Sequence, residues 1–316
     1  MRELAVGIDL GGTKIATGVV DGEGHVLCRI ELPTLAKEGP ERVIQRMEES
    51  VYRVLQQMDL SLADLEGIGV CVPGPVEAGS GVVKNPPNLP GWQEVPLLSI
   101  MREKFNINVQ LENDANAAAL GEHLFGVGKG IENFIYITIS TGIGGGVIAG
   151  GRLLRGESGG AAEIGHMTIN FEGPTCGCGN RGCFEAYASG TAMARFAREG
   201  ILAGRKTVLA DLYKKEEVRA EHIFAAAREG DEFARELVEK EGFYLGVGLA
   251  NVVNAYNPRR IAIGGGLTKA WDMFYERMLK VMRETALAAS VENLEVVRAV
   301  LGQDVGVIGA ASLIFH

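Results

Sequence analysis

The sequence predicts an α/β protein built from two lobes, and three observations support this. The chain has 316 residues, which exceeds the size at which a single hydrophobic core usually stops growing. Short apolar strands joined by glycine turns occur twice, once near the N-terminus and once near the middle of the chain. The segments between and after these strands carry apolar residues at helical spacing. We expect a ligand cleft between the lobes, because the glycine turns of the two copies would face each other there.

The first lobe begins with three predicted strands. These are LAVGIDL, KIATGVVD and HVLCRIEL (residues 4–10, 14–21 and 25–32), and the glycine turns GGT and GEG between them indicate a β-meander. Residues 40–58 place apolar side chains on one helical face with charges opposite. A buried strand over 64–73 and a short helix over 114–126 complete a predicted β-β-β-α-β-α order, with the helices packed on a mixed sheet.

The second copy of the strand plan covers NFIYITIS, GGGVIAG and GRLLRG (residues 133–140, 144–150 and 151–156). The chain then becomes mainly helical, over 191–201, 221–230 and 231–257, and Pro258 ends the last of these helices. A strand in RRIAIGGGL, a helix over 269–285, a strand in LEVVRAV and a last helix over 305–315 follow. We expect the boundary between the lobes near residues 120–129.

Composition excludes several classes of protein. The net charge is −9, and clustered cations that could bind phosphate backbones are lacking, so a nucleic-acid surface is not expected. Apolar runs are broken before they reach membrane-span length, and the N-terminus has no signal-peptide pattern. We therefore expect a cytoplasmic protein with no membrane contact, in which thiols stay reduced and available to metal. The 44 glycines are about twice the usual share, and the excess is expected in turns and ligand loops.

The strongest local signal is a cluster of metal-binding residue types. His166, Cys176, Cys178 and Cys183 hold three of the five cysteines and one of the five histidines, and Cys₃His is a standard set of ligands for structural zinc. The glycines between the cysteines allow a short loop to fold back on itself. Small buried cysteines beside an unrelated histidine are the alternative; a disulfide fits less well, because the cysteine count is odd and Cys-x-Cys suits ligation.

Two carboxylates flank this cluster. Glu163 lies three residues before the histidine, and Glu185 lies two residues after the last cysteine. A metal ion bound by the cluster would therefore hold both carboxylates at the edges of one folded loop.

Three glycine turns end predicted strands. Asp9-Leu10-Gly11-Gly12-Thr13-Lys14 offers backbone N–H groups, a hydroxyl and a cation that can cradle a phosphate; it lacks the spacing of a P-loop, and an ordinary hairpin turn is the alternative. The turn over 141–146 imitates a dinucleotide fingerprint, but a strand and not a helix follows it, which argues against that fold. The third turn is 264–266. Together the turns suggest an elongated, phosphate-bearing ligand.

Asn113 and Asp114 lie between the predicted strand INVQLE and the helix ANAAALGEHL. This position predicts Asp114 as the helix N-cap. Alternatively, Asp114 is a general base that accepts the proton of a substrate hydroxyl as it attacks the γ-phosphorus of a nucleotide. Asn85, Asn88 and Asn113 could contact other hydroxyls, although a proline-rich turn equally explains the first two.

These motifs together resemble the ROK family of bacterial sugar kinases and related repressors, over essentially the whole chain. The resemblance rests on residues 9–14, on ENDANAAALGE, on STGIGGGVIAGGRLLRG running to Gly165-His166, and on CGCGNRGCFEAYASG. NPPNLPGW, GHMTIN and CFEAYASG are most similar to its ATP-dependent glucokinases. The resemblance implies the actin-like ATPase fold of sugar kinases, Hsp70 and actin, in which two lobes, each a mixed β-sheet flanked by helices, close on ATP and sugar. The small lobe would contain residues 1–120 and about 303–316, and the large lobe 121–302 with the zinc loop 166–183.

The resemblance also implies roles for individual residues. Asp114 would be the catalytic base, and Asp9 would help to hold Mg²⁺. Sugar hydroxyls would be bound by Asn88, Asn113, Asp114, Glu163, His166 and Glu185. Phosphates would be contacted by Gly11, Gly12, Thr13, Lys14, Thr141 and Gly142, and the adenosine by Gly265 and Gly266. One ring nitrogen of His166 would bind structural zinc and the other the sugar.

The expected activity is ATP-dependent phosphorylation of the 6-hydroxyl of D-glucose, and the resemblance suggests a homodimer. A kinase for N-acetylmannosamine, fructose, mannose or another hexose is the alternative within the enzyme class, because a few hydrogen bonds decide which sugar is accepted. A sugar-sensing repressor is the alternative outside it. Repressors of the family carry a helix-turn-helix module before the first strand, and the early start of that strand, at Leu4, together with the acidic charge, argues against this reading.

Overall fold

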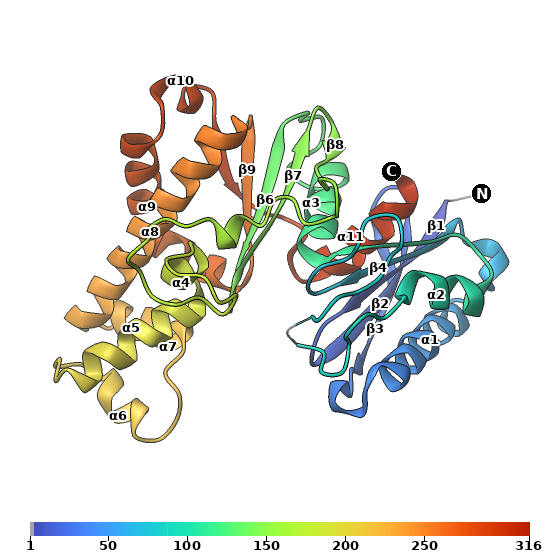
Figure 1. Cartoon of the computed structure of the whole chain (residues 1–316), viewed down its shortest axis with the longest axis horizontal. Helices are drawn as coiled ribbons and strands as arrows, with labels where there is room; N and C mark the ends of the chain where they lie inside the picture. The colour runs from blue at the N-terminus through green and yellow to red at the C-terminus, as the bar shows by residue number, and fades with distance from the viewer. Residues whose placement is uncertain (1–2, 87) are drawn as a thin grey trace. The chain divides into compact units, whose positions relative to one another are not determined.

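The computed structural model describes residues 3–86 and 88–316. It contains two mixed five-stranded sheets with helices packed against them (Figure 1), which confirms the predicted fold class. The chain forms two compact units. Unit 1 contains residues 1–136, 146–162 and 299–316, and unit 2 contains residues 137–145 and 163–298. The expected boundary at 120–129 lies inside unit 1.

The first sheet has the strand order β3-β2-β1-β4-β5. Its strands are β1 (Leu4–Leu10), β2 (Lys14–Asp21), β3 (Val26–Pro33), β4 (Gly67–Val72) and β5 (Val109–Asn113). The first three are antiparallel neighbours, which confirms the predicted meander, whereas β4 and β5 continue the sheet in parallel. The parallel register places Asp9, Cys71 and Glu112 side by side. Polar groups that follow these strands therefore gather at one edge of the sheet.

The α-helices that the structure describes in unit 1 are α1 (Pro40–Gln57), α2 (Leu97–Phe105), α3 (Asp114–Leu124) and α11 (Val305–Phe315). The predictions for α1, α3 and α11 are confirmed, whereas α2 was not predicted. α1 and α2 share a core with the apolar side chains on one face of the sheet. α11 packs on β1, β4 and α3. Gly7 and Gly69 make this close packing possible, because a Cβ at either position would collide with a carbonyl oxygen of α11.

The second sheet has the strand order β10-β9-β6-β7-β8. Its strands are β6 (Phe134–Ile139), β7 (Ile143–Ala149), β8 (Arg152–Leu153), β9 (Arg260–Gly264) and β10 (Glu295–Arg298). These strands match the predicted segments, except that β7 begins one residue before its segment, at Ile143. β7 and β8 are antiparallel, and β9 and β10 are parallel.

The helices of unit 2 are α4 (Glu185–Ala188), α5 (Gly190–Leu202), α6 (Leu209–Tyr213), α7 (Ala220–Arg228), α8 (Glu232–Tyr256), α9 (Trp271–Thr285) and α10 (Ala288–Val291). The predictions for α5, α7, α8 and α9 are confirmed; α4, α6 and α10 were not predicted. α8 ends at Tyr256, and the left-handed backbone of Asn257 (φ 45°) caps it directly before Pro258. Short 3₁₀ helices occur at Ala36–Glu38 (η1), Leu62–Asp64 (η2), Ile164–His166 (η3), Gly266–Ala270 (η4) and Gly302–Asp304 (η5).

Within the described part of the chain, none of the helices combines the length and the apolar character that crossing a membrane would require.

Candidate active site and metal centre

The four residues of the predicted zinc cluster lie together in unit 2. The ligand atoms of His166, Cys176, Cys178 and Cys183 all lie within 4.8 Å of one another. The sulfurs of Cys178 and Cys183 are 3.7 Å apart, and His166 Nδ1 is 3.8 Å from the sulfur of Cys176. Zinc bonds to sulfur of about 2.3 Å in a tetrahedron would separate two sulfurs by about 3.8 Å. The donor set and its spacing therefore fit a structural zinc ion.

Backbone hydrogen bonds fold the loop that carries these ligands. Cys176 donates its N–H to the carbonyl oxygen of Asn180 at 2.8 Å, and Gly179 donates to the carbonyl oxygen of Cys176 at 3.0 Å. Gly179 and Gly182 have φ angles of 91° and 71°, which side chains with a Cβ rarely adopt. A Cβ at Gly182 would also collide with the carbonyl oxygen of Asn170. The glycines of this motif thus allow the tight turn that brings the sulfurs together.

The thiols lie in different environments. Burial raises the pKa of Cys176 to about 12 and also raises the pKa of Cys183. At Cys178 desolvation acts in the same direction, but hydrogen bonds, first of all with the backbone of Asn180, outweigh it and lower the pKa. The thiolate is the form that binds metal, so a bound cation would supply the charge that the buried sulfurs need.

Glu163 and Glu185 lie beside the cluster, as their positions in the sequence predicted. His166 turns its Nδ1 atom toward Cys176, and its Nε2 atom lies 4.0 Å from the carboxylate of Glu163. Glu185 begins α4; its Oε1 atom is 3.6 Å from the sulfur of Cys176, and its Oε2 atom accepts the N–H of Ile143 at 2.9 Å. The two nitrogens of one imidazole therefore face the thiols and a carboxylate respectively, so His166 can connect a metal with a polar ligand.

A large cavity in unit 2 includes two of the predicted nucleotide-binding positions. It has a volume of about 750 Å³ and is lined by Thr141, at the turn after β6, and by Gly266, after β9. Gly142 and Gly265 are the neighbours of these two residues. Gly265 has a φ of 89°, and a Cβ there would collide with the carbonyl oxygen of Ile139, so this turn passes tightly over the end of β6. A pocket of this size can hold a nucleotide.

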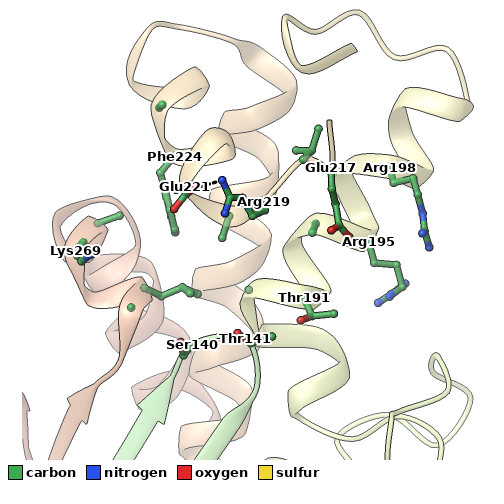
Figure 2. A pocket seen from close by; sticks show the side chains of 18 of the residues that line it. Ser140, Thr141, Thr191, Arg195, Arg198, Glu217, Arg219, Glu221, Phe224 and Lys269 are labelled. Atoms are coloured by element: carbon green, nitrogen blue, oxygen red, sulfur yellow. Dashed lines mark ion pairs between the residues drawn. The ribbon is translucent and has the colours of Figure 1, made fainter. Parts of the chain in front are cut away.

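Cationic side chains line the same cavity, and sequence reasoning did not identify them. Figure 2 shows the side chains from α5, α7 and η4 around it. The cationic residues of the lining are Arg195, Arg198, Arg219, Arg228 and Lys269. Glu217 and Glu221 also line it, and Arg219 forms an ion pair with Glu221 at 2.9 Å. These cations come from separate segments, so no local spacing could have indicated a common pocket.

Asp9 lies near the carboxyl end of β1 in unit 1. The thiol of Cys71 donates to its Oδ1 atom at 3.6 Å. Gly306, in the first turn of α11, approaches so closely that a Cβ would collide with Oδ2. Burial raises the pKa of the Asp9 carboxyl, since charge is costly to bury. A cation bound at this carboxylate would offset that cost, so the residue is suited to a metal ion.

The glycine turn after β1 is closed by a hydrogen bond from the N–H of Gly11 to the carbonyl oxygen of Lys14 at 2.9 Å. A Cβ at Gly12 would collide with Asn88, whose side chain is exposed. The structure thus brings the proline-rich segment to the first glycine turn. Lys14 forms an ion pair with Glu31 at 2.6 Å. Binding of a phosphate by this lysine would need its side chain to leave Glu31 or to bridge the two groups.

The prediction that Asp114 caps α3 is wrong, because Asn113 does so. Asn113 Oδ1 accepts the N–H groups of Ala115 and Asn116 at 2.9 and 3.2 Å, and its Nδ2 donates to the carbonyl oxygen of Gly74 at 3.1 Å. Asp114 is the first residue of the helix and is exposed, with its Oδ1 atom 2.8 Å from the N–H of Ala115. An asparagine amide can fill the cap as well as a carboxylate. The carboxylate of Asp114 keeps the favourable charge of a helix N-terminus.

The predicted site residues therefore form three local groups. Asp9, the turn 11–14, Asn88, Asn113 and Asp114 are in unit 1. The cysteine cluster with Glu163, His166 and Glu185, and the cavity with Thr141 and Gly266, are in unit 2. The three groups consist of carboxylate and amide groups at a sheet edge, a zinc-type ligand set, and a pocket whose cationic lining was not predicted.

Curated relatives cover nearly the whole chain. A glucokinase from Thermotoga maritima is 38% identical over 98% of this chain and 96% of its own length. A xylose repressor from Bacillus subtilis is 34% identical over 98% of this chain, which spans 76% of the repressor.

Solved structures have the same fold. A ROK hexokinase from Thermus thermophilus superimposes with a TM-score of 0.84 at 40% identity, covering 99% of this chain and 97% of the other. A ROK family glucokinase from Streptomyces griseus, solved with glucose and AMPPNP, superimposes with a TM-score of 0.82 at 35% identity, covering 98% of both chains. The model of the ROK family itself matches residues 5–316. This chain belongs to the ROK family.

Proposed function

We propose that this protein is an ATP-dependent hexokinase, and specifically a glucokinase that phosphorylates the 6-hydroxyl of D-glucose. One observation carries the proposal: the Streptomyces griseus glucokinase solved with glucose and AMPPNP shares the fold over 98% of this chain at 35% identity. The glucokinase from Thermotoga maritima, similar over nearly its full length, supports the same activity.

Asp114 is the proposed general base. Its carboxylate is exposed at the first residue of α3, where the helix N-terminus stabilises negative charge. Such a carboxylate assists mainly by orienting the sugar hydroxyl. It accepts the proton late, when the attacking oxygen has begun to bond to phosphorus and has become acidic. Positioning is expected to supply most of the rate enhancement, as is usual in phosphoryl transfer.

Sugar recognition is proposed for Asn88, Asn113, Glu163, His166 and Glu185. The contacts of His166 support its double role, because Nδ1 faces Cys176 while Nε2 faces Glu163. The amide of Asn113 is already engaged with the start of α3 and with Gly74. Asn113 would therefore bind sugar only with the lone pair or proton that these contacts leave, and its main effect would be to hold the turn.

The nucleotide is proposed to occupy the cavity lined by Thr141 and Gly266. Its volume of about 750 Å³ and its five cationic side chains suit a large anionic ligand. Backbone groups of Gly11, Gly12 and Thr13, and of Thr141 and Gly142, would contact phosphates, with Lys14 adding a cation. Gly265 and Gly266 would lie against the adenosine.

Two metal ions are proposed with different tasks. Magnesium bound with ATP neutralises charge on the phosphates, and Asp9 is the residue proposed to help hold it. Zinc, held by His166, Cys176, Cys178 and Cys183, would stabilise the loop between Glu163 and Glu185. Four protein ligands fill a tetrahedral zinc site, so its proposed role is structural.

A coupled assay of ADP release across a panel of hexoses tests this function. We expect ATP turnover to depend on added sugar and to be fastest with glucose; the panel should include mannose, fructose and N-acetylmannosamine. Faster turnover of another hexose would show that this hexose, and not glucose, is the preferred substrate. If no sugar stimulated ADP release while sugar still bound, a sensing role like that of the related repressors would be the better account. Light scattering of the purified protein tests the proposed homodimer.

A further inference from the structure

Glu112 is a buried carboxylate that connects three parts of unit 1. Only 5% of the residue is exposed. Its Oε1 atom accepts hydrogen bonds from the N–H of Asn113 at 3.0 Å and from Nδ2 of Asn116 at 3.1 Å. Its Oε2 atom accepts Nε of Arg155 at 2.6 Å. One side chain thus joins the end of β5, the first turn of α3 and the segment that follows β8.

The carboxylate of Glu112 is hydrogen-bonded to the turn that carries the proposed general base, Asp114. Asn113 and Asp114 follow Glu112 in sequence. The backbone N–H of Asn113 is held by Glu112, and the side chain of Asn113 is held between α3 and Gly74. The direction in which the exposed carboxylate of Asp114 points therefore depends on the hydrogen bonds of its two preceding residues.

Arg155 supplies the charge that this arrangement requires. A buried carboxylate without a counter-charge is costly, and it moves or draws in water to reduce that cost. Arg155 places its guanidinium against Glu112 while 43% of its own side chain stays exposed, so its desolvation is small. Without Arg155, Glu112 would be expected to turn toward solvent and to release the N–H of Asn113.

We propose that the ion pair of Arg155 and Glu112 is a positioning device for phosphoryl transfer, which fixes the Asn113-Asp114 turn without touching the substrate. This inference rests on the proposed role of Asp114 as general base. It gives a functional role to Arg155, which lies outside the residues predicted for the site.

The space around Arg155 allows a direct test. A cavity of about 320 Å³ is lined by Arg155, Glu112, Arg102 and His316, among others. In the Arg155→Ala variant this cavity would extend to the carboxylate of Glu112. Free guanidinium could then enter and replace the lost group, whereas sodium at the same ionic strength lacks the planar donors that match a carboxylate.

The experiment compares kcat and KM of Arg155→Ala with those of the wild type. We expect kcat to fall about 10- to 100-fold, the scale of a small displacement of a catalytic group, while KM for ATP changes by less than about twofold. Millimolar guanidinium should restore part of kcat, and matched sodium chloride should not. The double variant Glu112→Gln/Arg155→Ala should be faster than Arg155→Ala, because it no longer buries an unpaired charge.

Arg102→Ala is the matched control. Arg102 lines the same cavity but donates to the carbonyl oxygen of Val109 through Nε and Nη2; this substitution should lower stability and leave kcat unchanged. If Arg155→Ala does not fold, Arg155→Lys takes its place, with a smaller expected loss of kcat. The proposal would be overturned if Arg155→Ala kept the wild-type kcat, or if neither guanidinium nor the added Glu112→Gln substitution raised its kcat. An equal loss of kcat in Arg102→Ala would also overturn it. A wild-type rate in Asp114→Asn would instead refute the proposed base, and guanidinium should not stimulate that variant.

Discussion

Asn113 and Asp114 divide two tasks between adjacent side chains at the start of α3. The amide of Asn113 caps the helix and holds the loop at Gly74, so the carboxylate of Asp114 is exposed at the first helical residue. From the sequence, both residues were expected between the strand and the helix, and Asp114 was predicted to be the helix N-cap. Cap preferences of asparagine and aspartate are nearly equal, so composition could not decide which of two neighbours would cap.

Substitution of these two residues separates the tasks. We expect Asn113→Ala to lower the free energy of unfolding by about 1 to 2 kcal/mol, because two helix N–H groups lose their acceptor. In Asn113→Asp, which keeps an acceptor for the cap, the free energy of unfolding should fall by a smaller amount. Asp114→Ala is the control, and its free energy of unfolding, measured in urea, should fall by less than that of Asn113→Ala. A larger loss in Asp114→Ala would show that Asp114 is the cap after all.

The buried carboxyl of Glu241 predicts that the stability of the protein depends on pH. It is 2% exposed on α8, and its Oε1 atom has no hydrogen-bond partner among the described residues. Burial raises its pKa well above the ordinary value of 4.5. The folded state then binds a proton that the unfolded state has released, so stability falls as pH rises from about 4.5 to the raised pKa, by up to about 1.4 kcal/mol per pH unit.

Thermal unfolding of Glu241→Gln across this pH range is the corresponding measurement. The variant stays neutral at every pH, so its melting temperature should decline less between acidic and neutral pH than that of the wild type. Parallel pH profiles for the two proteins would mean that Glu241 finds a charge partner in solution.

The loop from His166 to Cys183 is the element that the sequence predicted in most detail. Its ligands are close in sequence, and the glycines between them identified the turn, so local spacing carried almost all of the information. The cationic cavity is the opposite case. Arg195 and Arg198 lie on α5, Arg228 on α7 and Lys269 on η4, and only the packing of these elements makes them neighbours. On a single helix each arginine is typical of a solvated face.

Removal of the metal tests whether zinc stabilises the loop from His166 to Cys183. We expect purified protein to contain about one zinc ion per chain, because four ligand atoms converge on one point. Cys178→Ser should lose the zinc and lower both the melting temperature and the affinity for sugar, since the loop carries Glu163 and Glu185 at its ends. Cys28→Ser, at a cysteine on β3, is the control for loss of a thiol. Full stability and sugar affinity in zinc-free protein would contradict this role.

Another buried carboxylate, that of Glu122, holds the segment that leads into α11. Glu122, on α3 and fully buried, accepts the N–H groups of Val300 and Leu301 at 2.8 Å each with Oε1, and that of Val127 at 3.1 Å with Oε2. Glu122→Gln would replace one acceptor oxygen with a donor. We expect a loss of at least about 2 kcal/mol in unfolding free energy. Glu103→Gln, at an exposed position of α2, should change it by less than about 0.5 kcal/mol; an equal effect at both sites would contradict the assigned contacts of Glu122.

Across the whole molecule, several strands were predictable because they are apolar runs that end at a glycine turn, as β1, β2, β6 and β9 do. Their order in the sheets was not, since β4 adds beside β1 and β9 beside β6, and pairing between distant segments leaves no local pattern. The helix α2 was missed although Leu97, Leu98, Met101 and Phe105 follow a helical pattern of burial. Its nine residues follow a proline-rich turn directly, and the turn signals outweighed the short periodicity.

We propose that the chain phosphorylates glucose with ATP and that Asp114 takes the proton. Formation of glucose 6-phosphate by the wild type and by Asp114→Asn is the measurement that decides between this mechanism and its alternatives. The amide has the shape of the carboxylate but cannot accept the proton, so we expect kcat to fall by about 10² to 10⁴-fold while circular dichroism and glucose binding are retained. Glucose 6-phosphate formation at the wild-type rate in Asp114→Asn, or its absence in the wild type, would contradict the claim.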